Sequence, residues 1–219
     1  PDYYPLLLQY RQALLQRNEM LRQCCGRAPQ EELLLAWDES LVKPGALIWQ
    51  KRYQMVERLL PLARNLHRGI TGEKEELSLT YQGFLPIEMA NSTQKELEQV
   101  FLKKLAQGRR EDIVRGLNLI GPHRDDLEIC INGQPARQFA SQGQQRTAAL
   151  SLKLSQVELV LQERGEYPAL LLDDVLSELD AHRKQQLLQL MEGKAQTFIT
   201  ATDSHFTLPW GNRYRVEQG

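Results

Sequence analysis

The stretch Tyr167-Pro-Ala-Leu-Leu-Leu-Asp-Asp174 contains a short apolar run that ends in two aspartates. Such a run predicts a strand buried on both faces, as strands of parallel sheets are. A helix over residues 182–191 and a second apolar strand over 197–201 are predicted to follow, which together make a β-α-β unit. The stretch therefore places Asp173 and Asp174 at the carboxyl end of a buried strand, the edge at which open parallel sheets bind ligands.

Two carboxylates at such an edge suit nucleotide hydrolysis. The first, Asp173, would help to hold Mg²⁺ beside the phosphates, and the second, Asp174, would orient or polarise the attacking water. A buried strand followed by an acidic turn gives the same pattern without any catalysis. The motif alone leaves both interpretations open.

A second candidate phosphate site is the segment Ser141-Gln-Gly-Gln-Gln-Arg146, at the start of a helix predicted over residues 144–163. Free backbone N–H groups and the helix dipole favour an anion there, and Gly143 would let the backbone approach a phosphate closely. Ser141 could equally be a simple N-cap. The order of this turn, its helix, the apolar strand and then Ser177-Glu-Leu-Asp180 makes the combination more specific than any single motif.

The first part of the chain reads as mainly helical. Residues 3–25 form an amphipathic pattern with arginines between the apolar positions, and a second long helical stretch follows, which should pair antiparallel with the first. Pro44 and Pro61 predict a kink or break in that second helix. A strand is expected over residues 77–81, and a helix over 93–106 that Ser92-Thr93 can cap.

The pattern changes after residue 108. Leu127, Ile129 and Ile131 alternate with polar residues, and Asn132-Gly133 supplies the residues of a two-residue turn, so a β-hairpin is predicted. We expect a domain boundary near residue 108.

Charge and composition set further limits. Lysine and arginine number 27 against 28 acidic residues, so a nucleic-acid surface would have to be local. One candidate is the group around Gly108, for which a solvated loop is the alternative; it comprises Lys103, Lys104, Arg109 and Arg110.

The cysteines and the hydropathy pattern bear on location. The chain has 3 cysteines, Cys24, Cys25 and Cys130, whose spacing fits neither a disulfide framework nor a metal site, which favours a reducing compartment. Neither a membrane span nor an export signal is recognisable, so we expect a cytoplasmic protein.

Three segments together resemble the hallmark segments of the RecF family: Gly121-Pro-His-Arg-Asp-Asp126, Ser141-Gln-Gly-Gln-Gln-Arg-Thr147 and Leu171-Leu-Asp-Asp-Val-Leu-Ser-Glu-Leu-Asp180. The resemblance implies an α/β fold. Residues 109–219 would be the C-terminal part of an ATP-binding-cassette or SMC-type P-loop ATPase head, and residues 1–108 a mainly helical arm lobe.

The same resemblance implies a DNA-binding ATPase of recombinational gap repair, replication and the SOS response. It would use ATP and Mg²⁺, form an ATP-dependent homodimer on single-stranded, gapped or junction DNA, and load RecA together with RecO and RecR. It also assigns roles by position. Asp173 would bind Mg²⁺, and Asp174 would be the catalytic base. The signature motif, which contacts the γ-phosphate on the partner subunit, would be Ser141, Gly143, Gln144, Gln145 and Arg146. Ser177 and Asp180 would form the D-loop at the dimer interface, Thr202 would occupy the switch position, and Arg124 is a candidate contact to nucleotide or DNA, although a structural role for its segment is also open.

No Gly-x-x-x-x-Gly-Lys-Ser/Thr motif occurs in the 219 residues, so this chain alone is expected not to hydrolyse ATP. In the family that loop lies near the N-terminus, and the start at Pro1 leads us to expect an N-terminal deletion. Part of the head's sheet would then be missing and apolar surface would be exposed.

Two other interpretations remain. An SMC-like chromosome-organising ATPase has the same head, but its arm is far longer than the helical part expected here. A non-catalytic interaction module would bind repair partners through the helical lobe and use the incomplete head as a scaffold. Threonine at position 202, where transporter cassettes usually carry histidine, favours the repair family over transporters.

Overall fold

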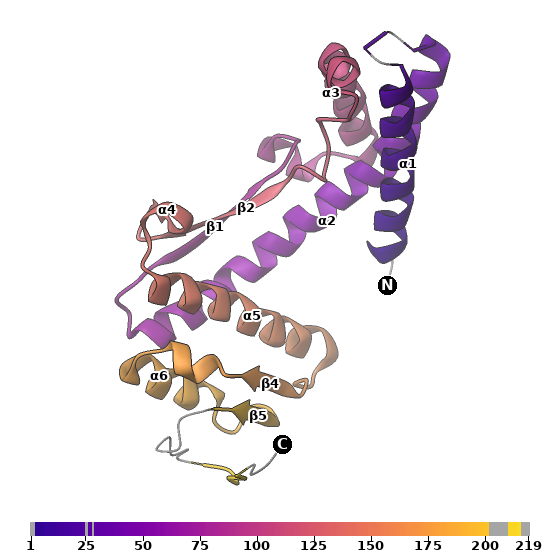
Figure 1. The fold of residues 1–219 in the computed structure, drawn as a ribbon. Helices are drawn as coiled ribbons and strands as arrows, with labels where there is room; N and C mark the ends of the chain where they lie inside the picture. Colours follow the sequence, from indigo (N-terminus) through magenta and orange to yellow (C-terminus); the bar gives the residue numbers. More distant parts are fainter. Residues whose placement is uncertain (1–2, 25, 28, 202–209, 216–219) are drawn as a thin grey trace. The chain divides into compact units, whose positions relative to one another are not determined.

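The computed structural model describes residues 3–24, 26–27, 29–201 and 210–215, with the backbone alone at Ser177 and Glu178 (Figure 1). Its contacts form two compact units: the first comprises Pro1–Val56 and Thr80–Glu128, and the second Glu57–Leu79 and Ile129–Gly219. This division differs from a single boundary near residue 108, because helix α3 (Gln94–Arg115) continues through that position. Among the described helices, none is both long and apolar enough to cross a membrane.

The first unit is mainly helical. Helix α1 (Tyr3–Gln23) runs antiparallel to the first half of α2 (Glu31–Thr71), as predicted. Two contacts show this: Tyr3 at the start of α1 bonds Arg52, whereas Arg17 near its end bonds the earlier Asp38. These two helices and α3 enclose a core of large apolar side chains. Its fully buried members include Leu41, Ile48, Trp49, Leu97, Phe101 and Leu105.

Helix α2 is one continuous helix of 41 residues, so the predicted break at Pro44 or Pro61 is wrong. A proline removes one backbone hydrogen bond and crowds the preceding turn. Tertiary packing offsets this cost, because Leu41 and Ala46 on either side of Pro44 are buried, as is Ala63, two residues after Pro61.

Helix α3 begins where the sequence predicts but ends later. Thr93 and Glu96 form a reciprocal capping box at its start. The helix then continues to Arg115, where Gly116 adopts the left-handed conformation. The loop expected around Gly108 is therefore helical, and a Cβ at position 108 would lie 2.6 Å from Cδ1 of Ile120, so glycine permits that close packing.

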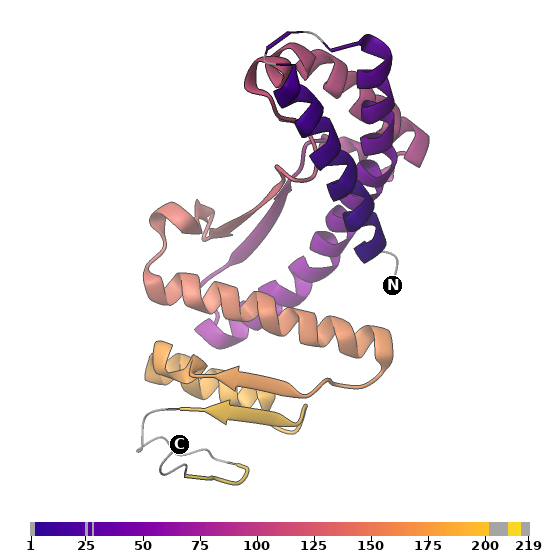
Figure 2. The ribbon, with the colours of Figure 1, turned by 45° about the vertical axis from the view of Figure 1, so that its right-hand side comes forward.

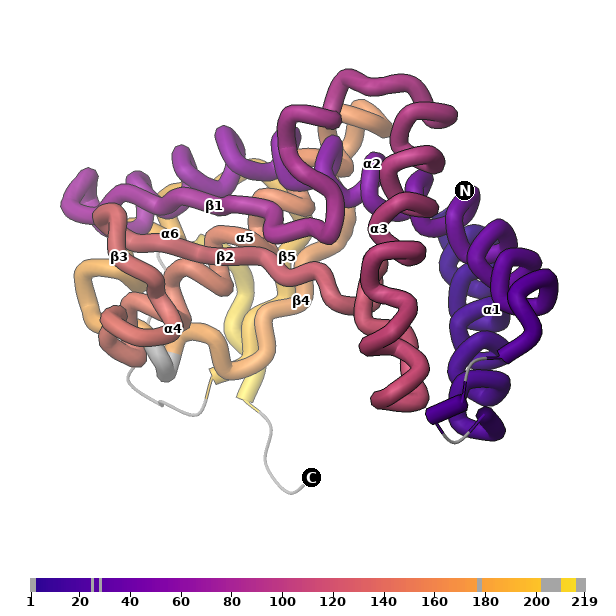
Figure 3. The backbone as a smooth tube through the Cα atoms, turned by 90° about the horizontal axis from the view of Figure 1, so that it is seen from above, coloured from indigo at the N-terminus to yellow at the C-terminus, as the bar shows by residue number. Residues whose placement is uncertain are grey.

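A three-stranded sheet has the order β1 (Leu77–Gln82), β2 (Asp126–Ile131), β3 (Gln134–Pro135), and Figure 3 shows β1 and β2 running side by side. The predicted hairpin is confirmed: β2 pairs antiparallel with β3 through Asn132-Gly133. Both turn residues have positive φ, 52° and 75°, as a type I′ turn requires. The short helices η1 (Ile87–Asn91) and α4 (Ala136–Phe139) follow β1 and β3 along the chain.

The second unit contains the predicted β-α-β unit. Strands β4 (Leu170–Asp173) and β5 (Thr197–Thr200) are parallel, joined through η2 (Val175–Glu178) and α6 (Ala181–Met191) (Figure 2). Helix α5 (Gln142–Arg164) precedes them. The core of this unit is built from α2, α5, β4 and α6, and its buried residues include Ile70, Leu150, Leu154, Leu172, Leu187 and Met191.

One face of the β4–β5 pair carries exposed apolar side chains. Leu171 and Phe198 are register partners and are 74% and 55% exposed. The prediction of a strand buried on both faces is therefore wrong for this chain, while the expectation of exposed apolar surface is confirmed. Strand alternation places Asp173 and Thr200 on the same face as these two residues.

Candidate active site

Asp173 and Asp174 lie at the carboxyl end of β4, and Thr200 lies beside them at the end of β5. The Thr200 hydroxyl donates to Oδ1 of Asp173 at 2.6 Å and accepts the backbone N–H of Asp174 at 3.0 Å. One side chain therefore orients the first carboxylate and fixes the backbone of the second. Thr200 was not predicted as a site residue, although its position at the end of the second parallel strand was the available signal.

The backbone of Asp174 is in the left-handed region, with φ 50° and ψ 18°. This conformation is uncommon for residues other than glycine, and aspartate and asparagine tolerate it best. It turns the chain out of the strand and directly into η2. Strained backbone of this kind is concentrated at functional sites.

These groups fit a magnesium–nucleotide complex better than a free metal ion. The donors at the strand ends are carboxylate and hydroxyl oxygens, which Mg²⁺ prefers. Among the described residues there is no cluster of three or more metal-ligating side chains. Mg²⁺ bound to nucleotides commonly takes only one or two protein carboxylates, and phosphates and water complete its coordination.

The predicted signature turn is well formed. Ser141 caps α5: its Oγ accepts the N–H of Gln144 at 3.3 Å, and its own N–H donates to Oε1 of Gln144 at 2.9 Å. A Cβ built on Gly143 would meet nothing within 4 Å, so no packing among the described residues requires glycine there. Gln145 is held by backbone, because its amide donates to the carbonyls of Ala136 and Ala140.

The D-loop prediction falls on the start of α6. Asp180 caps this helix by accepting the N–H of Arg183 at 2.9 Å. The side chain of Ser177, and all of Thr202, lie outside the described residues.

Arg183 joins the two turns and was not predicted. Its Nη1 donates to the carbonyl of Gly143 at 3.2 Å and to the hydroxyl of Thr147, and its Nη2 pairs with Oε1 of Glu75 at 2.8 Å. Its Nε lies 3.2 Å from Oδ2 of Asp180. We call Arg183 with these four partners the Arg183 bridge. It links the signature turn, the loop before β1 and the start of α6.

His67 packs behind the bridge. Its Nε2 lies 3.3 Å from Oε2 of Glu75, and its Nδ1 is 3.2 Å from Oγ of Ser151. Burial lowers the pKa of His67 below its ordinary value, and the charge of Arg183 acts in the same direction, whereas Glu75 opposes it.

In the first unit, the Gly121–Asp126 segment is firmly anchored. Asp125 accepts the Tyr81 hydroxyl and the N–H of Phe84, and burial raises its pKa. His123 hydrogen-bonds Tyr10 at 2.7 Å on one side of its ring and the Asn118 carbonyl at 3.0 Å on the other.

Arg124 is exposed on this anchored turn, and its side chain forms no hydrogen bond or ion pair with the described residues.

The predicted basic group lies on α3, and its members differ. Arg109 pairs with the buried carboxylate of Asp38 at 3.1 Å, so its charge is committed within the unit. Lys103 and Arg110 are exposed and seven positions apart, on one face of the helix. Lys104 is half-buried.

Comparison with known proteins identifies the family. A curated relative from Halothermothrix orenii, named DNA replication and repair protein RecF, is 47% identical over 204 residues, which are 93% of this chain and 54% of that protein. RecF of Thermosynechococcus vestitus is 42% identical over 99% of this chain and 57% of its own length. Over its own length, this chain is a RecF-family sequence.

Solved structures agree with the sequence comparison. The recombination mediator protein RecF of the RecFOR pathway has been solved as RecF-ATPrS and RecF-ATP, and both match with a TM-score of 0.80. Their identities to this chain are 35% and 34%, over 93% and 94% of its length and 54% of theirs. The RecF fold, that of an ATP-binding-cassette or SMC-type ATPase, is thus confirmed, and the chain spans about half the length of the relatives it matches. No family model matches the chain.

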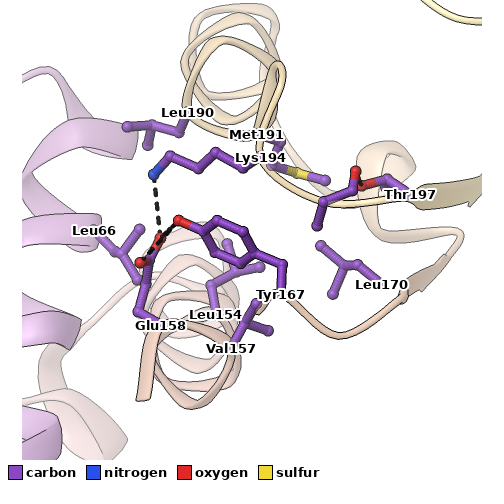
Figure 4. A pocket seen from close by; sticks show the side chains of 11 residues that line it. Leu66, Leu154, Val157, Glu158, Tyr167, Leu170, Leu190, Met191, Lys194 and Thr197 are labelled. Atoms are coloured by element: carbon purple, nitrogen blue, oxygen red, sulfur yellow. Dashed lines mark hydrogen bonds and ion pairs between the residues drawn. The ribbon is translucent and has the colours of Figure 1, made fainter. Parts of the chain in front are cut away.

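A small cavity in the RecF-like second unit is not part of the candidate site. It has a volume of about 30 Å³, and its lining includes Leu170 and Thr197, the first residues of the two strands (Figure 4). The carboxylates of Asp173 and Asp174 lie at the other end of β4. Glu158 accepts from Tyr167 and pairs with Lys194 beside it. A space of this size holds about one water molecule.

Proposed function

We propose that this chain supplies the catalytic carboxylates and the signature turn of a DNA-dependent ATPase that acts in recombinational gap repair. The supporting observation is the trio at the strand ends, in which Thr200 fixes Asp173 and the strained backbone of Asp174. A strand end at which two acids are exposed is suited to a magnesium–nucleotide complex.

Each residue has a distinct role in this proposal. Asp173 binds Mg²⁺, which neutralises the phosphate charge, and Asp174 orients the attacking water. Ser141 and Gly143 meet the γ-phosphate of a nucleotide held by a second subunit, with Gln144, Gln145 and Arg146 shaping that turn. Ser177 and Asp180 lie at the dimer interface. The P-loop comes from a part of the complete protein outside these 219 residues.

The proposed partners follow from the family. DNA phosphates would meet exposed cations of the first unit, foremost Arg124, Lys103 and Arg110, with Lys104 beside them. The solved RecF structures are described as part of the RecFOR pathway, so RecO and RecR are the proposed protein partners.

The test is ATP hydrolysis by the complete protein with and without gapped duplex DNA. We expect DNA to raise the rate, and Asp174→Asn to bind ATP normally but to lower kcat about 10²- to 10⁴-fold, the range for a lost general base. Glu166→Gln, a change of an exposed acid just before the same strand, is the matched control and should keep wild-type turnover.

Unchanged turnover in Asp174→Asn would remove that residue from its role. Absence of hydrolysis in the complete wild-type protein would instead favour the non-catalytic interaction module.

A further inference from the structure

We propose that Arg183 is the positioning residue that holds the signature turn and the start of α6, where the D-loop is predicted, together as one rigid element. This inference rests on the proposed function, because it concerns how this subunit meets a nucleotide bound to its partner. It assigns a role to a side chain that belongs to neither the signature motif nor the strand-end acids.

The three guanidinium nitrogens of Arg183 contact three separate segments of the chain. Nη1 reaches the carbonyl of Gly143 and the hydroxyl of Thr147 in the first turns of α5, and Nη2 reaches Glu75 in the loop before β1. Nε faces Asp180, which caps the helix that carries Arg183 itself. The planar guanidinium fixes the directions of all these bonds, so the segments cannot shift independently without breaking one of them.

Glu75 anchors the bridge from the other side. Its carboxylate is 11% exposed and accepts from Arg183 at 2.8 Å and from the amide of Gln144 at 3.2 Å. Gln144 is also the residue that forms the capping box with Ser141. Glu75 therefore ties the same arginine to the residue that orients the exposed serine.

The loop that carries Glu75 is itself pressed against α6. Gly72 has φ +62°, and a Cβ there would lie 2.7 Å from Nε2 of His182, the neighbour of Arg183. A side chain at position 72 would be strained at that φ and would displace the exposed imidazole of His182. The turn that precedes Glu75 thus lies close to the start of α6.

Two features distinguish this bridge from ordinary packing. First, Arg183 donates to the carbonyl of Gly143, a glycine that no packing among the described residues requires. Second, that carbonyl lies two residues from the exposed Ser141. A signature turn that must contact a nucleotide on a second subunit has to be held rigidly from behind. Small errors in its position would lower the rate of hydrolysis by large factors.

A mixing experiment with the complete protein separates this role from a general structural one. Arg183→Gln alone is expected to lower ATP hydrolysis about 10²-fold, the cost of a misplaced group, with ATP binding to the isolated subunit unchanged. Asp174→Asn alone is expected to be inactive because it lacks the carboxylate that orients the attacking water. In a mixed dimer, the Asp174→Asn subunit still offers an intact signature turn to the nucleotide on the Arg183→Gln subunit.

Mixing the two inactive variants in equal amounts should therefore restore hydrolysis, to about one quarter of the wild-type rate for random pairing in a symmetric dimer with independent sites. Lack of recovery, while size-exclusion chromatography with ATP shows that mixed dimers form, would overturn the inference. So would a wild-type rate in Arg183→Gln alone. Absence of hydrolysis in the wild-type protein would instead be a failure of the proposed function.

Two further variants guard against misfolding. Arg183→Lys keeps the charge beside Glu75 but loses the fork, so it should be impaired alone and rescued by the same mixing. Glu75→Gln keeps the shape of the acceptor without its charge and should be impaired in the same way, and circular dichroism checks that each variant folds. Full activity of both would contradict the inference.

Discussion

Each compact unit contains an arginine that joins several segments, and the two differ in what they join. Arg17 is fully buried in the first unit, where it bonds Asp38, Asp112 and Asn118, each at 2.8 Å. Arg183 is 16% exposed in the second unit, and the less exposed of its two carboxylate partners, Glu75, is itself 11% exposed.

The difference lies in the partners. Those of Arg17 are side chains within helices and the turn that follows α3, all inside the unit. Those of Arg183 include the backbone of a turn that is open on its outer side. The first arginine is suited to stability and the second to placement, and this contrast can be tested by measuring stability and activity for the same pair of variants.

The largest effect on stability is expected for Arg17→Met. Removing the cation leaves the buried carboxylate of Asp112 without its charge partner and leaves Asp38 paired with Arg109 alone. Breaking a buried ion pair in this way costs about 3–5 kcal/mol. Urea unfolding followed by circular dichroism measures the change in the free energy of unfolding.

Arg115→Ala on α3, which breaks an exposed pair with Glu111, is the control and should leave the urea midpoint in place. The contrast between the two arginines fails if Arg183→Gln loses as much stability as Arg17→Met.

A smaller effect is expected from pH. Burial lowers the pKa of His67, so near its ordinary value of about 6.5 the unfolded chain binds a proton that the folded protein excludes. The stabilising contribution is complete above that pH and is lost as the pH falls through the folded pKa, with a slope of at most about 1.4 kcal/mol per pH unit for one proton.

His67→Gln should therefore flatten the decline of stability as the pH falls below about 6.5. Urea midpoints at several pH values measure this slope. Burial also lowers the pKa of His123 in the first unit, so His123→Gln should remove a separate part of the decline. A decline that both variants leave unchanged would rule out these two histidines.

The smallest effect is expected for Arg58→Gln. Arg58 and Glu163 also lie 2.8 Å apart in the second unit, but their side chains are 48% and 52% exposed. An exposed pair contributes little, so the loss should stay below about 0.5 kcal/mol. ATP hydrolysis by the complete protein should be unchanged, and a defect like that of Arg183→Gln would show that any arginine–glutamate pair in this unit affects turnover.

The sequence predicted those parts of the fold that depend on local patterns. The hairpin follows from Asn132-Gly133, the cap of α3 from Thr93, and the β-α-β unit from two short apolar runs around a helix. The prolines of α2 misled the prediction, because the helix is stabilised by packing that local rules do not include.

Long-range polar pairs were beyond local patterns. Glu75 and Arg183 are 108 positions apart, and neither stands out in its own segment. Arg17 did carry a signal, since it lies seven positions after the buried Tyr10 and four after the buried Ala13, on the apolar side of α1. Arg17 was instead predicted to lie between the apolar positions of that helix.

The backbone of Asp174 has a consequence for which amino acids this position can accept. Substitution tables built on chemical similarity rank glutamate close to aspartate, because both carry a carboxylate. At φ 50° the ranking changes: glycine, asparagine and aspartate fit, while glutamate must adopt a conformation that residues with longer side chains rarely take. Of the residues that adopt this conformation most readily, only aspartate carries an acid, whereas a glutamate would take it at a conformational cost, as Glu73 does at φ 62°.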